Sequence, residues 1–118
     1  MVFASVQRFE SVQMTTEKTI TNKILSALNN LPGCRAVKIH SGAMQGAGLA
    51  DITGCYKGRA FWIEVKKPGE LPTKLQAFDL YLWGRSGAIV GYATNVVDAV
   101  DIVVNPNLPN PYEMDGKR

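Results

Sequence analysis

Apolar residues at helical spacing predict three helices in this chain. The first covers 17–30, after the possible caps Thr15 and Thr16, and ends before Pro32-Gly33. The second covers about 73–85, and a third starts after Asn95, which can cap it. The side chains assigned to the apolar faces of the first two helices are Ile20, Ile24, Ala27, Leu28 and Leu31, and Leu75, Phe78, Leu82 and Trp83.

Short apolar or alternating segments predict four strands, over 35–40, 49–56, 59–66 and 88–93. The Lys57-Gly58 pair between the second and third strands is typical of a tight hairpin turn. The order α-β-β-β-α-β-α indicates an α/β (α+β) fold, a mixed β-sheet flanked by helices. Trp62 is expected to pack under the first helix.

The domain organisation follows from length and local composition. The 118 residues, 46% of them hydrophobic, suit one domain, placed at 15–104. Residues 1–14 show no clear period and stay unassigned, and 105–118 form a proline-rich tail. No apolar run approaches the roughly 20 residues of a membrane span, and no secretory signal is evident, so a cytoplasmic protein is expected.

Net charge and cysteine content limit which partners, metal sites and catalytic residues are expected. The 13 basic and 10 acidic residues give a net charge of +3, which permits a phosphate-bearing partner without requiring one. Two cysteines without CxxC spacing and a single histidine, His40, come close to excluding a structural zinc site. Any catalysis is therefore expected to depend on carboxylates and lysines.

The predicted hairpin brings charged residues together. With Lys57-Gly58 as the loop, Asp51 lies opposite Glu64, and alternation puts both on one face with Lys66. Two facing carboxylates repel, and a divalent cation is the usual remedy. Oxygen ligands favour Mg²⁺ or Mn²⁺ over zinc. A bulge at the turn would shift the register by one residue and separate the pair.

Each of these acids also has a structural interpretation. Glu17 lies on the apolar stripe of the first helix and could reach a metal on the sheet, or it complements the positive end of that helix. Glu64 and Lys66 alone are more typical of a solvated strand face with a weak ion pair. Three features favour a functional site over these structural interpretations: the position of Asp51 opposite Glu64, the apolar neighbours, and the preceding glycine-rich segment.

Three segments form an ordered set of motifs: Gly48-Leu49-Ala50-Asp51, then Phe61-Trp62-Ile63-Glu64-Val65-Lys66-Lys67-Pro68, then Leu75-Gln76. This set resembles the PD-(D/E)xK nuclease superfamily, and within it most resembles the VRR-NUC (virus-type replication–repair nuclease) family. Their spacing is also similar to that of archaeal-type Holliday-junction resolvases. Ala50 stands where the family usually has proline, a residue that ligates nothing. The resemblance implies a restriction-endonuclease-like core and a Mg²⁺- or Mn²⁺-dependent DNA endonuclease, with branched DNA such as Holliday junctions as substrate and a role in DNA repair.

The resemblance also implies roles for individual residues. Asp51, Glu64 and the Val65 carbonyl would bind the metal, with Glu17 binding directly or through water. Lys66 would orient the attacking water or stabilise charge on the phosphate, and Gln76 would hydrogen-bond to the site. Residues flanking this site are candidates for contacting nucleic acid, or are ordinary surface groups: Lys67, Lys74, Gln45 and His40.

The predicted partners are DNA and a second copy of the chain, without a membrane or a small-molecule cofactor. Cutting two strands needs two sites, which a two-fold symmetric homodimer would supply. The apolar, proline-rich C-terminal third is a candidate interface. Two alternatives remain: a non-catalytic nucleic-acid-binding module with the nuclease fold, and a small structural protein whose acids form surface pairs.

Overall fold

A computed structural model describes residues 16–40 and 50–105 as an α+β fold with a four-stranded mixed sheet and three helices. The segments 1–14 and 106–118 and the candidate Gln45 lie outside the described residues. Along the chain the elements are α2 (Glu17–Asn29), β1 (Cys34–Lys38), β2 (Ile52–Tyr56), β3 (Arg59–Val65), α3 (Lys74–Arg85), β4 (Ile89–Ala93) and α4 (Val96–Val104). The predicted element order agrees with this order, with ends that differ by up to three residues.

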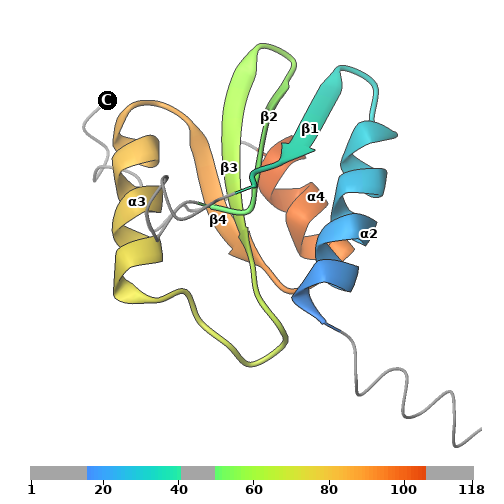
Figure 1. Ribbon diagram of the computed structural model, residues 1–118. Coiled ribbons are helices and arrows are strands. Elements are labelled where there is room, and N and C mark those ends of the chain that lie inside the picture. The colour runs from blue at the N-terminus through green and yellow to red at the C-terminus, as the bar shows by residue number, and fades with distance from the viewer. Residues whose placement is uncertain (1–15, 41–49, 106–118) are drawn as a thin grey trace, which may run out of the picture.

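The strands lie in the order β1-β2-β3-β4, antiparallel except for the parallel pair β3–β4 (Figure 1). Helices α2 and α4 cover one face of the sheet, and α3 covers the other (Figure 1). Among the described strands β4 is an edge strand, with β3 as its only neighbour. No helix in the described parts of the chain combines the length and apolar character needed to cross a membrane.

The β2–β3 hairpin has the predicted register. Lys57 and Gly58 both have positive φ angles, of 48° and 88°, as a two-residue turn of this twist requires. Tyr56 pairs with Arg59, and Ile52 pairs with Ile63. No bulge shifts the ladder, so the residues just before β2 and near the end of β3 lie beside one another.

The main core lies between the sheet and the α2–α4 layer. It contains the predicted stripe of α2, with Ile24 and Leu28 fully buried, and the inward side chains of β3, Phe61, Ile63 and Val65. Thr16 caps α2 by accepting a hydrogen bond from the Thr19 backbone N–H. At the other end of this helix, the Asn29 side chain bonds both the N–H and the carbonyl of Ala36, which fastens α2 to β1.

The predicted apolar face of α3 is wrong. Leu75, Phe78 and Leu82 are exposed, and α3 instead packs on the sheet through Leu80, Gly84 and part of Trp83. Trp62, expected under the first helix, stacks on Trp83 with the ring centroids 4.1 Å apart. Helix α3 has apolar residues on both sides, so periodicity alone does not indicate which side meets the sheet.

Candidate active site

Asp51 and Glu64 meet where β2 begins and β3 ends. The Asp51 Oδ2 accepts a hydrogen bond of 2.8 Å from the Val65 backbone N–H, which fixes the carboxylate against β3. The Asp51 carbonyl accepts another, of 2.7 Å, from the Ile39 N–H, so the residue is held between β1 and β3. The predicted proximity of the two acids is therefore present in the structure, although β2 itself begins only at Ile52.

Glu64 is an almost completely buried acid, with 2% of its surface exposed. Burial and the neighbouring Asp51 raise the pKa of Glu64 to about 9, against an opposing effect from Lys66. In its protonated form Glu64 hydrogen-bonds to Asp51. Its Oε1 accepts a 2.9 Å bond from Gln76, whereas its Oε2, once the acid is ionised, has no donor among the described residues. A buried acceptor without a donor is costly, and a cation would satisfy it.

Gln76 joins the site to the start of α3. Its side-chain oxygen accepts the Thr73 backbone N–H at 2.9 Å, while Thr73 accepts the Gln76 N–H, which forms a capping box. Its amide nitrogen then faces Glu64 and donates the bond described above. The Gln76 side chain therefore does two things: it accepts the Thr73 N–H at the start of α3, and it donates a hydrogen bond to Glu64.

Replacing Gln76 by alanine is expected to lower the melting temperature by more than replacing Thr73 by alanine. Thr73→Ala removes the side-chain cap on the residue 76 N–H, at a cost of about 1 kcal/mol. Gln76→Ala keeps that cap but loses two bonds, the one to the Thr73 N–H and the donor to buried Glu64. Melting both variants in EDTA, followed by circular dichroism, measures the difference. Equal melting temperatures would show that the Gln76–Glu64 bond contributes nothing.

The other residues predicted for the site differ in their exposure and in their effect on Glu64. Lys66 follows β3 and is 8% exposed; its charge acts on Glu64, and its N–H donates to the Ala93 carbonyl at 3.0 Å. Glu17, half-buried in the first turn of α2, adds the weakest repulsion on Glu64. Lys67, Lys74 and His40 are exposed; Lys67 lies 4.0 Å from Glu70, an exposed pair.

Asp79 on α3 is a residue that the sequence analysis missed. It accepts hydrogen bonds from the Ala50 backbone N–H and from Trp83, while its Oδ2 is buried without a donor among the described residues. Burial raises the pKa of Asp79, and those two bonds oppose the rise. Ala50 directly precedes Asp51, so Asp79 ties α3 to the backbone that carries Asp51. Its i, i+4 spacing to Trp83 was a usable signal.

The carboxylate oxygens of this site are suitable ligands for a hard divalent cation. Asp51 and Glu64 offer carboxylate oxygens at one point, one of them without a hydrogen-bond donor in the described residues. Mg²⁺ is commonly held by one or two carboxylates together with waters and substrate phosphates. Over 16–40 and 50–105, no group of three or more His, Cys, Asp or Glu side chains converges on one point.

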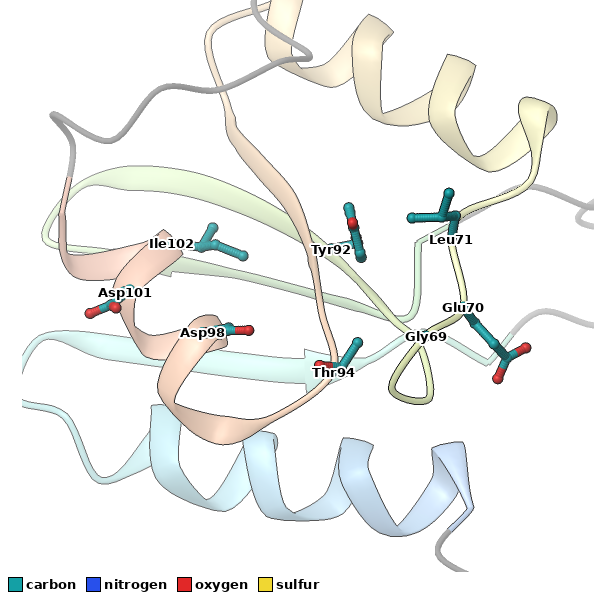
Figure 2. A pocket seen from close by; sticks show the side chains of 8 residues that line it. All are labelled: Gly69, Glu70, Leu71, Tyr92, Thr94, Asp98, Asp101 and Ile102. Atoms are coloured by element: carbon teal, nitrogen blue, oxygen red, sulfur yellow. The ribbon is translucent and has the colours of Figure 1, made fainter.

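A groove of about 490 Å³ lies beside β4. It is bounded by β4, by α4 and by the segment after β3 (Figure 2). Three acids line it, Glu70, Asp98 and Asp101, with Tyr92 and Ile102 between them. Carboxylates repel phosphates, so three acids in the lining make this groove a poor site for a phosphate group.

Comparison of the chain with protein-family models, with curated proteins and with solved structures found no match. The case for a function therefore depends on the residues themselves and their arrangement.

Proposed function

We propose that this chain is a divalent-metal-dependent DNA endonuclease of the PD-(D/E)xK type, with a restriction-endonuclease-like core and motifs most similar to those of the VRR-NUC family. One observation carries the proposal: buried Glu64 meets Asp51 on one side and Gln76 on the other, with Lys66 two residues along the chain. Two neighbouring acids, one of which has an oxygen that no described residue satisfies in the ionised form, suit the binding of a cation.

The proposed site residues have two roles: some would bind the metal ion, and others would stabilise charge on the phosphate or hold the ligands in place. Asp51, Glu64 and the Val65 carbonyl would hold Mg²⁺ or Mn²⁺, with Glu17 contributing through water. A bound cation of this kind polarises a phosphate and acidifies water. Lys66, a residue with 8% of its surface exposed, would hold a positive charge against the phosphate or the attacking water. Gln76 keeps Glu64 in place.

Binding of a cation requires Glu64 to lose its proton. Because the pKa of Glu64 is raised to about 9, this acid is mainly protonated at neutral pH without a cation. Cation binding therefore releases a proton, and apparent affinity rises with pH. The neutral form limits the repulsion between Glu64 and Asp51 in the free protein.

The substrate class follows from the resemblance. We propose branched DNA, with two active sites supplied by a homodimer, because hydrolysis of two strands needs two centres. The exposed Lys67, Lys74 and His40 are available to contact phosphates beside the site.

A cleavage assay tests this function. The full chain is offered a labelled four-way junction, a matched linear duplex and a single strand, each with Mg²⁺, Mn²⁺ or EDTA. We expect paired cuts on the junction that disappear in EDTA. Cutting of all three substrates would retain the nuclease and remove the preference for junctions. Salt-dependent binding without cutting would overturn the nuclease in favour of a non-catalytic module.

A further inference from the structure

A cavity of about 350 Å³ lies at the turn end of the β2–β3 hairpin. Its aliphatic lining comes from Ile89 of β4 and from Val103 and Val104 at the end of α4, and Tyr56 of β2 adds an aromatic ring. Val103 is 1% exposed and belongs to the main core, so the lining on this side is well packed. The volume is at the lower end of the range for pockets that hold small molecules.

Two cations complete the lining, Lys57 and Arg59, and both are held by contacts within the protein. The Lys57 backbone N–H donates to the Gly33 carbonyl at 2.9 Å, and its ammonium lies 5.3 Å from the centroid of the Tyr56 ring. The Arg59 Nε donates to the Gly87 carbonyl at 3.4 Å. None of the described lining residues is acidic, so two positive charges stand beside an apolar surface.

We propose that this cavity binds a small aliphatic anion, with a carboxylate or phosphate head group. The three aliphatic side chains offer no hydrogen-bond partner, so the part of the ligand that lies against them must be apolar. A nucleotide base is therefore a poor occupant, because its polar edges would be left unpaired. The head group meets Lys57 and Arg59, and a guanidinium pairs well with either a carboxylate or a phosphate.

This cavity is separate from the acid pair. Along β3, residue 64 comes five positions after residue 59, which at about 3.3 Å per residue is roughly 17 Å. Alternation places Arg59 on the face of Phe61 and Ile63, towards α4, whereas Glu64 faces α3 and bonds Gln76. The inference therefore does not rest on the proposed function.

A nuclear magnetic resonance titration of the ¹⁵N-labelled full chain tests the proposal, in EDTA and without DNA. Octanoate is expected to cause saturable amide shifts at Gly58, Ile89 and Val104, and none at Glu64 or Tyr92. Octanol, with a tail of the same length and no charge, should bind at least about tenfold more weakly. Octyl phosphate separates the two head groups, since the tighter of the two anions identifies the preferred one.

A charge-removing variant tests the role of the cations. Lys57→Gln should raise the dissociation constant of octanoate about tenfold and leave that of octanol unchanged, because only the attraction to the head group is lost. The bond to Gly33 involves the backbone alone, so the turn is kept, and circular dichroism verifies the fold. The matched control is Lys23→Gln, at an exposed lysine of α2, which should bind octanoate like the wild type.

Chain length tests the aliphatic lining in the unaltered protein. Each methylene that enters the cavity should tighten binding by about fourfold, so octanoate should bind about 15-fold more tightly than hexanoate. Three results would overturn the proposal: no shifts at the lining residues, equal affinities for octanoate and octanol, or equal octanoate affinities for Lys57→Gln and the wild type. No DNA or metal enters these measurements, so failure of the nuclease proposal would leave their results unchanged.

Discussion

Replacing Lys66 by alanine is expected to reduce DNA cleavage by about 1,000-fold or more while the protein remains folded. Lys66 is 8% exposed and its charge acts on Glu64, so in the proposed mechanism its ammonium stabilises the reacting phosphate. Its backbone bond to Ala93 does not involve the side chain, so the connection between β3 and β4 persists in the variant.

The measurement is the rate of cleavage of bound DNA under single-turnover conditions, with Mg²⁺ in excess. Lys23→Ala is the matched control, since Lys23 is an exposed lysine on α2. It should cleave at the wild-type rate, and Lys66→Arg should recover part of the loss. Wild-type cleavage by Lys66→Ala would refute the proposed mechanism.

The second large effect is expected at Glu64. Most substitutions of buried residues lower the melting temperature, whereas this one should raise it. Replacing Glu64 by glutamine should raise the melting temperature at pH 8 in EDTA by more than about 5 °C. Glutamine is neutral and of similar shape, so it can accept the Gln76 bond and donate to Asp51 without a charge to desolvate. The same variant should lose any stabilisation by Mg²⁺.

The pH dependence follows from proton linkage. The pKa of Glu64 is raised from its ordinary 4.5 to about 9 in the folded state, so the folded protein binds this proton more tightly than the unfolded chain does. Stability from this group is therefore fully present below pH 4.5. It is lost as pH rises towards 9, by at most about 1.4 kcal/mol per pH unit.

Thermal melts in EDTA between pH 5 and 9 measure this effect, with Glu70→Gln as the control at an exposed acid. The wild type and the control should lose stability together as pH rises, whereas Glu64→Gln should change less. The difference between the curves isolates Glu64 from other titrating groups. Parallel curves for all three proteins would mean that Glu64 is not held protonated.

The hairpin and the acid pair were predictable because local rules determine them. A two-residue turn with Lys57 and Gly58 at positive φ sets the register, and alternation then determines which residues face one another. Asp51 and Glu64 follow from counting outwards from that turn. The stripe of α2 was predictable for a similar reason, because only one of its sides is apolar.

The orientation of α3 was not predictable from periodicity. Leu75, Phe78 and Leu82 share one face and Leu80 and Trp83 another, so two sides compete for the core. The decision depends on a tertiary contact, the stacking of Trp83 of α3 on Trp62 of β3. The role of Asp79 depends on the same docking, because Ala50 comes near it only when α3 lies on this face.

The acidic groove beside β4 has a consequence for solubility. The outer edge of β4 has no strand neighbour among the described residues, and an open edge is a template for adding strands from other molecules. Three carboxylates line the groove beside β4, those of Glu70, Asp98 and Asp101. A strand added at this edge would have to remove water from them. These carboxylates therefore protect an apolar edge strand, with the sequence Ile-Val-Gly-Tyr-Ala, from edge-to-edge aggregation.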